Sequence, residues 1–587
     1  MGDNKNFVLF AVISLAILLG YNFLYAGPRQ AEYERQRLLQ QEEEALSQAD
    51  LAPVSSAASN TLPQAVTPGE TTQPIAMQDA GFIRIETPEL SGSLSLRGAR
   101  FDDLTLVNHK TEKDENADNV RLFKKYGSAD AYYAQFNWHA PRGAEDTIPN
   151  DSTAWTADSD LLTPEQPVTL SWVNNAGIKF LMKVEVDDHF MIGVTQTVIN
   201  VSDQPLTLAP SAEIRRTGTP KTDGLLILHE GPIGVFGGLL EETGYDDLKE
   251  DGNFTGTPQE GDLKGGWMGL TDKFWMATLV PNNTDILQRA RLTYAGKNGN
   301  DVYGADYAQT WQTIAPGETA ETTNRLYAGA KIVNVIDTYE TRYEIQNFEK
   351  AIDWGYLWFF TRPIFTGLHW LFEVTGNYGV AILLMTVILK LGLFPLANKS
   401  YVSMAHMKRA QPKIKALQER YKDDKQKMQQ EMMALYKTEK INPMAGCLPM
   451  IPQMFIFFAL YKTLYVTIEM RHQPFFGWIQ DLSAADPLTP LNLFGLIPWD
   501  PPSMIAIGVL PLLMGVSMWL QQKLNPQTSM DPMQQKVMNM LPILFTFIMA
   551  QFSAGLVLYW TWNNILSIAQ QWVIMRREDA RMAALGK

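Results

Sequence analysis

Long apolar segments constrain this chain more than any other feature of its sequence. A helix that crosses a bilayer needs roughly 20 predominantly apolar residues, and it satisfies its backbone polar groups internally. One such segment begins the chain, and the others follow a polar region between residues 80 and 350. The sequence therefore predicts an α-helical membrane protein. The apolar segments lie at about 7–26, 378–397, 448–468, 504–522, 537–553 and 556–574.

Residues 1–26 allow two interpretations, an uncleaved transmembrane anchor and a cleaved signal peptide. Residues 1–6 contain one Lys and one Asp, whereas a signal peptide begins with a positively charged region. Leu24 also stands where a cleavage site needs a small residue. Both observations favour the anchor. Residues 27–80 are charged and then rich in Ser, Thr, Ala, Pro and Gln, so we predict a flexible linker there.

Residues 81–342 have the pattern of an antiparallel β-sandwich domain. Apolar residues alternate from Phe180 to Val186, Asp187 and the following Asp supply a turn, and the alternation resumes at Phe190. This pattern predicts a β-hairpin with one apolar face on each arm. Further short apolar runs are separated by Gly, Pro, Asn and Asp with almost no helical period, which favours a sandwich.

Composition argues against several kinds of functional site. The single cysteine, Cys447, excludes an intrachain disulfide framework and a cysteine-based zinc site. The seven histidines form no HExxH motif, and a net charge of -14 argues against nucleic-acid binding. The glycine-rich stretch 229–238 lacks a following Gly-Lys-Ser/Thr, which favours a structural loop over a phosphate loop. We therefore predict no catalytic residue, metal, cofactor or specific nucleic-acid site.

Residues 343–376 are rich in aromatic side chains, including Trp354, Trp358 and Trp370, with polar residues between them. This composition is typical of an amphipathic helix that lies in the membrane interface. An ordinary aromatic flank of the next span is the alternative, and the residues do not separate the two.

The charges of the loops predict the orientation. Loop 398–441 has eleven basic and five acidic residues, a net of +6, whereas loop 467–503 has a net of -3. The positive-inside rule places the first loop in the cytosol and the second outside. Both termini, including a short basic tail at 576–587, are then cytosolic, and the β domain lies on the outer, periplasmic side.

The basic loop 398–441 also carries two apolar stripes. Met407, Ile414 and Tyr421 recur every seven residues, and Met428 and Met432 begin a second stripe. Two short helices folded into an antiparallel hairpin are the simplest structure. Its excess positive charge suits a docking surface, and a solvated connection between spans is the alternative. The candidate docking residues are Lys408, Arg409, Lys413, Lys415, Arg420 and Lys425.

Lys390 lies within the segment 378–397, where an isolated ammonium is costly, by about 2.5 to 3.5 kcal/mol at the centre of a span. Two interpretations are open: the side chain snorkels to the cytosolic interface, or it faces a water-filled cavity in the bundle. Polar residues in the apolar segments, including Thr386, Gln453 and Asn563, favour the cavity. Lys462 lies near the outer end of its segment, where snorkelling suffices.

Five motifs in the C-terminal part follow one another in a specific order. They are QPKI at 411–414, QEMMALYK at 430–437, the segment 442–449 that begins Asn-Pro, DPMQQK at 531–536 and SAGLVLY at 553–559. Together with 378–396 they resemble the YidC family of membrane protein insertases over about residues 350–575. The anchor and the large polar domain resemble the Gram-negative form of that family, with Gly-Gly-Trp at 265–267 as a weaker marker.

This resemblance implies a bacterial inner-membrane protein whose five-span core, 377–575, holds a hydrophilic groove open to the cytosol and to lipid. A positive residue in the groove attracts the polar segment of a nascent membrane protein, and no nucleotide is hydrolysed. The implied partners are nascent membrane proteins, the Sec translocon, the ribosome, the signal recognition machinery and membrane lipids. The candidate groove residues are Lys390, Thr386, Gln453, Tyr559, Trp560 and Asn563.

Two positions depart from the family pattern. The family usually has arginine at the position of Lys390, and Trp560 occupies the position of a groove tyrosine. Lysine keeps the charge but lacks the planar fork of a guanidinium. Two other functional classes compete with an insertase: a secondary transporter or channel, and a membrane-anchored periplasmic enzyme or binding protein. A transporter predicts repeated halves and acidic residues within spans, and neither is seen in the sequence.

Overall fold

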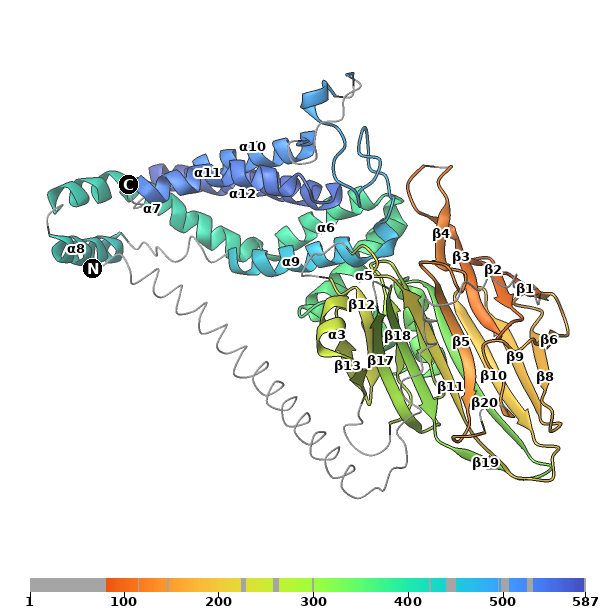
Figure 1. Cartoon of the computed structure of the whole chain (residues 1–587). Coiled ribbons are helices and arrows are strands. Elements are labelled where there is room, and N and C mark those ends of the chain that lie inside the picture. The colour runs from red at the N-terminus through yellow and green to blue at the C-terminus, as the bar shows by residue number, and fades with distance from the viewer. Residues whose placement is uncertain are drawn as a thin grey trace.

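The computed structural model describes residues 81–584, except 115, 145–146, 223–227, 257–262, 298–299, 422–423, 440–449, 495, 498–505 and 525–531. The predicted anchor and linker, 1–26 and 27–80, lie outside these residues. Figure 1 shows two parts, a pair of large β-sheets and a set of helices that extends away from one end of them.

The β domain contains two sheets that enclose one large apolar core. The strand order of the first sheet is β14-β17-β18-β11-β5-β3-β2-β1-β7, with β19 and β4 attached at its side. Its strands are β1 (Phe82–Glu86), β2 (Leu90–Ser95), β3 (Arg100–Lys110), β4 (Asn119–Phe123), β5 (Tyr132–His139), β7 (Leu161–Leu162), β11 (Leu206–Thr217), β14 (Phe254–Thr255), β17 (Leu287–Lys297), β18 (Asn300–Gln309) and β19 (Gln312–Ile314).

The second sheet has the order β13-β12-β15-β16-β20-β10-β9-β8-β6. All its pairs are antiparallel, whereas in the first sheet β1 and β7 pair in parallel, which the prediction of a purely antiparallel sandwich did not include. A short helix, α3 (Tyr245–Asp251), follows its edge strand. The strands are β6 (Thr156–Ala157), β8 (Val168–Val173), β9 (Lys179–Val186), β10 (Met191–Ile199), β12 (Gly231–Phe236), β13 (Leu239–Glu242), β15 (Trp267–Thr271), β16 (Trp275–Val280) and β20 (Thr319–Ala330).

The predicted hairpin is confirmed as β9 and β10. Phe180 pairs with Val198 and Val184 with Val194, and the apolar side chains of both arms are buried. Alternation with a period of two places them on one face, so the register follows from the sequence pattern. The glycine-rich stretch 229–238 is not the predicted loop, since most of it forms strand β12, and Gly237 and Gly238 make the turn to β13.

The β domain extends beyond its predicted end at residue 342. Helix α4 (Val333–Tyr343) and the 3-10 helix η3 (Phe348–Ala351) pack into the core of the sheets through Ile336 and Phe348, and Trp354 after η3 joins them. The predicted boundary assigns the apolar residues after 343 to the interface helix, whereas several of them pack in this core.

Only part of the helix predicted at 343–376 is present, as helix α5 (Trp358–Thr375). One face is buried, through Ile364, Phe365 and Leu368, while Trp358 and Trp370 are exposed. The helix is therefore amphipathic, with aromatic side chains on its outer face, as the composition predicted.

The remaining helices form a bundle with its own apolar core. Helices α6 (Tyr378–Gly392) and α7 (Phe394–Arg420) meet at a bend of 68°, so the predicted segment 378–397 is broken at Leu393. Pro395 explains the break, because proline fits the first turn of a helix but disfavours helical geometry before it. The other helices are α8 (Lys425–Thr438), α9 (Met450–Val466), α10 (Val509–Leu524), α11 (Pro532–Met549) and α12 (Ala554–Ala584).

Within the described residues, length and apolar composition together allow a membrane crossing only for the bent pair α6 and α7, and for no single helix. The predicted tail 576–587 is not a separate unit, since α12 continues through it to Ala584. The predicted hairpin is present as α7 and α8, which pack through Ala410 and Ile414.

Candidate functional site

A narrow crevice lies between three helices of the bundle. Helix α6 contributes Thr386 and Lys390, α9 contributes Gln453, and α12 contributes Tyr559 and Asn563. The structure thus brings together five of the six groove residues named from the sequence. Leu389, Leu393 and Ile456 complete the lining with apolar surface.

Lys390 is tethered across the crevice. Its Nζ donates to Ser567 Oγ on α12 at 2.6 Å, and that hydroxyl donates to the Asn563 carbonyl at 2.7 Å. Hydrogen bonds from charged donors are among the stronger ones, contributing about 1.5 to 3 kcal/mol. The tether therefore holds α6 and α12 together at the ammonium.

Sequence reasoning did not name Ser567, although a signal was present. Tyr559, Asn563 and Ser567 are spaced four residues apart, which places them on one face of a helix. Recognition that α12 is continuous through this stretch would have added the serine to the site.

Gln453 and Tyr559 form the second polar link of the crevice. Gln453 Nε2 donates to the Tyr559 hydroxyl at 2.8 Å, which joins α9 to α12. Tyr559 is buried in the core of the bundle, so its hydroxyl needs this partner. Thr386 is buried as well and donates to the Ile382 carbonyl within its own helix.

Trp560 does not line the crevice. Its ring packs against Phe457, at 4.6 Å between centroids, and Phe545, at 5.8 Å. It lies one residue after Tyr559 on the helix, and a 100° step turns it toward a different neighbour. Its predicted role as a groove wall is not supported by this position.

Lys390 forms no ion pair with any carboxylate in the part of the chain that the structure describes. The crevice has a free volume of only about 10 Å³, enough for roughly one water molecule. An ammonium has three donors, and Ser567 takes one of them. Lys390 lies in the last turn of α6, two residues before the helix ends at Gly392, and thus closer to the bend than its place in segment 378–397 implied.

Lys462 has a partner that the sequence prediction missed. Its Nζ lies 2.6 Å from Asp353 Oδ2, and both side chains are largely buried. Asp353 also accepts a hydrogen bond from the His229 N–H at 3.1 Å. The sequence prediction of a snorkelling lysine did not include this aspartate of the β domain. The pair fastens α9 to that domain.

The six basic residues of the hairpin differ in their surroundings. Lys408, Lys415 and Arg420 are exposed, and Lys413 pairs with Glu439. Arg409 pairs instead with Asp579 of α12 at 2.8 Å and donates to the Glu578 carbonyl, so it also fixes α7 against α12. Lys425 begins α8. Among the residues described, no group of three or more His, Cys, Asp or Glu side chains has the arrangement of a metal site.

The β domain and the helical bundle with its lysine crevice define a membrane-associated protein of two parts, and comparisons with known proteins identify the same two units. Residues 82–367 match the YidC periplasmic domain family, and residues 370–581 match the 60Kd inner membrane protein family. The chain is 45% identical to a membrane protein insertase YidC of Methylorubrum extorquens, over 99% of this chain and 97% of that one. It is 43% identical to that of Granulibacter bethesdensis, over the full length of both.

The chain therefore belongs to the YidC family of membrane protein insertases. It is an inner-membrane protein with a periplasmic domain, as those families are described. The family assignment decides against the transporter and the periplasmic enzyme as alternatives. A solved structure of an active YidC insertase is also similar, with 16% identity, a TM-score of 0.34 and coverage of 83% of this chain and 91% of that one.

Proposed function

We propose that Lys390 supplies the positive charge through which this insertase receives a polar segment of its substrate. The observation that supports this is an ammonium held between α6 and α12 with no carboxylate partner among the described residues. An unpaired cation in a low-dielectric bundle attracts an acidic or polar segment more strongly than it does in water. The apolar part of the substrate then partitions into lipid, at about 25 cal/mol per Å² of apolar surface buried.

The crevice described here corresponds to a closed state in this proposal. Substrate entry requires α6 and α12 to separate, which exchanges the Lys390–Ser567 and Gln453–Tyr559 hydrogen bonds for bonds to water or substrate. The bend at Leu393 lies next to Lys390 and provides the point about which α6 and α7 move. The cycle uses no nucleotide and no catalytic residue, and the protein acts as an insertase and chaperone.

We further propose a multi-pass protein with an N-terminal anchor, a five-span core, cytosolic termini and the α7–α8 hairpin in the cytosol. The +6 charge of loop 398–441 supports this orientation. Exposed Lys408, Lys415 and Arg420 make the hairpin a docking surface for the ribosome and the signal recognition machinery. The Sec translocon is a second partner. Cysteine labelling in a Cys447→Ser background tests the orientation: a cysteine at Lys415 reacts with an impermeant reagent only after the membrane is opened.

The groove charge is tested by complementation of a strain depleted of its own insertase. We expect Lys390→Arg to restore insertion of a small substrate with an acidic external tail, and Lys390→Ala to reduce it. Lys399→Ala is the matched control, because Lys399 is an exposed lysine nearby on α7. Normal insertion by Lys390→Ala, combined with loss of function on deletion of residues 82–330, would refute the proposal.

A further inference from the structure

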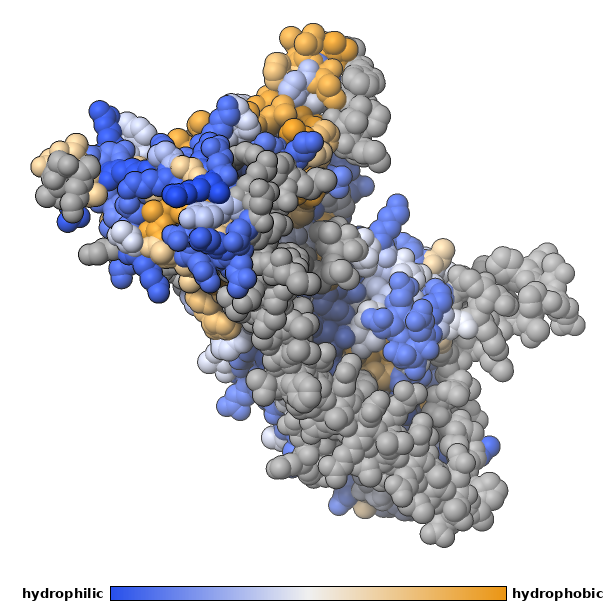
Figure 2. All heavy atoms as spheres, turned by 90° about the vertical axis from the view of Figure 1, so that its left-hand side faces the viewer, coloured by the Kyte–Doolittle hydropathy of each residue, from blue (hydrophilic) through white to orange (hydrophobic). Residues whose placement is uncertain are grey.

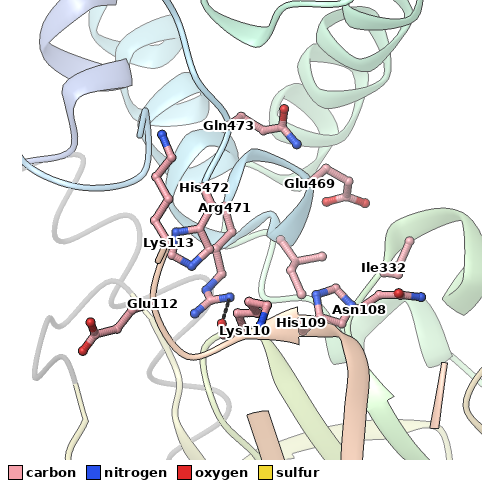
Figure 3. A pocket seen from close by; sticks show the side chains of 11 residues that line it. Asn108, His109, Lys110, Glu112, Lys113, Ile332, Glu469, Arg471, His472 and Gln473 are labelled. Carbon is pink, nitrogen blue, oxygen red and sulfur yellow. Dashed lines mark hydrogen bonds between the residues drawn. The ribbon is translucent and has the colours of Figure 1, made fainter. Parts of the chain in front are cut away.

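A second cavity, of about 390 Å³, lies where the β domain meets the helical bundle. It is formed by the end of β3 and the turn after it, by Ile332 before α4, and by the segment that follows α9 (Figure 3). This volume falls within the range of small-ligand sites. Its position and chemistry are separate from the crevice around Lys390.

Three cations border this cavity. Arg471 donates from Nη1 to the Lys110 carbonyl at 2.6 Å and from Nη2 to the Thr111 carbonyl at 2.9 Å. Lys110 Nζ donates to the Ala117 carbonyl at 2.9 Å, and Lys113 Nζ donates to the Gln480 carbonyl. Since neutral carbonyls accept these bonds, they orient the cations without cancelling their charge. None of the three cations has an ion-pair partner among the residues that the structure describes.

The acidic and histidine side chains of the cavity do not cancel this charge. Figure 3 shows the Glu112 carboxylate turned away from Arg471 and His472. Burial raises the pKa of Glu469 to about 7, so its negative charge is only partly formed near neutral pH. Burial and the nearby Arg471 lower the pKa of His109 to about 4, so that imidazole is neutral. Asp481 lies 2.9 Å from His472 and its charge acts on Arg471, so the three cations are opposed by Asp481, Glu112 and the partly ionised Glu469. The lining keeps a small excess of positive charge.

His472 adds an unused hydrogen-bonding group. Its Nδ1 lies 2.9 Å from Asp481 Oδ2, while its Nε2 is buried and has no partner among the described residues. Figure 3 places this ring beside Arg471 and Lys113. A buried polar atom without a partner is costly unless a ligand or water satisfies it.

In the topology proposed above, α9 is a span, and the cavity lies beside the end of that span at the membrane interface. Its floor includes the apolar Ile332 and Ile468, and Ile468 follows the last turn of α9, which ends at Val466. In the same loop, Phe476 is 62% exposed and Trp478 is 39% exposed. Exposed aromatics at a span end are typical of the headgroup level.

We infer that this cavity binds the phosphate headgroup of an anionic phospholipid from the outer leaflet. The phosphate oxygens accept from Arg471, Lys110 and Lys113, and the first part of the acyl chains lies along Ile332 and Ile468. A lipid fits better than an acidic peptide because cations and apolar surface occur together at interface depth. The bound lipid joins the β3–β4 turn to the loop after α9.

The inference is tested by titration of the full-length protein in detergent with phosphatidylglycerol, followed by native mass spectrometry. We expect Lys110→Gln/Lys113→Gln to weaken binding of the first phosphatidylglycerol by about tenfold, since each lysine near anionic lipid contributes substantially. Lys179→Gln/Lys183→Gln, with the same charge change on exposed residues of β9, is the matched control and should leave binding unchanged. Phosphatidylcholine should bind alike to all variants.

A second variant distinguishes a loss of lipid binding from a loss of the fold. Gln473→Trp keeps every charge but fills the cavity, and it should also weaken phosphatidylglycerol binding while thermal unfolding stays cooperative. Equal affinity for phosphatidylglycerol in the wild type and both variants would overturn the inference. Displacement of the lipid by millimolar inorganic phosphate would identify a free-phosphate site instead. Stronger binding of an acidic peptide than of the lipid would identify a peptide site.

Discussion

Replacement of Ser567 by alanine separates the charge of Lys390 from its hydrogen bond. The serine hydroxyl accepts from Lys390 Nζ at 2.6 Å, and this bond joins α12 to α6 at the crevice. If no water reaches the ammonium, loss of this acceptor lowers the free energy of unfolding by about 1.5 to 3 kcal/mol. If water enters beside it, water replaces the hydroxyl and the cost falls below about 1 kcal/mol.

We expect the smaller cost, because the serine-to-alanine change adds the volume of a hydroxyl to a crevice that already has room for about one water molecule. Ser567→Ala should therefore retain most insertion activity in the depleted strain, and its melting temperature in detergent should fall by only a few degrees. Thr561→Ala, which removes another hydroxyl of α12, is the matched control. If Ser567→Ala is as inactive as Lys390→Ala, the geometry of the tether rather than the charge is what matters.

Three further changes test the links around the site. Gln453→Leu leaves the buried Tyr559 hydroxyl without its partner and should destabilise the bundle by about 1 kcal/mol, measured by thermal unfolding. Addition of Tyr559→Phe should restore part of this stability. No recovery would contradict the Gln453–Tyr559 hydrogen bond. Lys462→Met removes the ion-pair partner of Asp353, so it should lower the free energy of unfolding by about 2 kcal/mol and increase hydrogen exchange at 350–356. The double variant Lys462→Met/Asp353→Asn should lose less stability, and an equal loss in both variants would argue against the pair. Burial raises the pKa of Glu469 from 4.5 to about 7, so the folded state binds more protons than the unfolded state between these values. Stability should therefore fall as pH rises from about 4.5 to 7 and level off above, and Glu469→Gln should flatten this dependence; an unchanged slope in that variant would exclude Glu469 as its source.

Period and spacing in the sequence were sufficient for much of the architecture. Alternation from Phe180 onward gave the β9–β10 hairpin with its register, because a period of two assigns each side chain to one face. The lysine crevice was also predictable, since polar residues within apolar segments collect inside a bundle. Hydropathy could not show the break at Leu393, which depends on the local geometry that Pro395 imposes.

Contacts between the two parts of the molecule lay beyond sequence reasoning. Lys462 and Asp353 are more than a hundred residues apart, so neither residue predicts the other. The same holds for Arg471 and the carbonyls of the β3–β4 turn. Trp560 shows that adjacency in the sequence does not place two residues at the same site. Its neighbour Tyr559 lines the crevice, whereas one helical step turns Trp560 toward Phe457.

In the proposed mechanism a positive charge at Lys390, rather than a particular hydrogen-bond geometry, serves insertion. The most direct measurement is the insertion rate of one acidic-tailed substrate with Lys390, Lys390→Arg, Lys390→Gln and Lys390→Ala in the depleted strain, at matched protein levels. We expect the arginine variant to equal the wild type and the glutamine and alanine variants to be deficient. Activity of Lys390→Gln equal to the wild type would contradict this mechanism, because glutamine keeps a donor and removes only the charge.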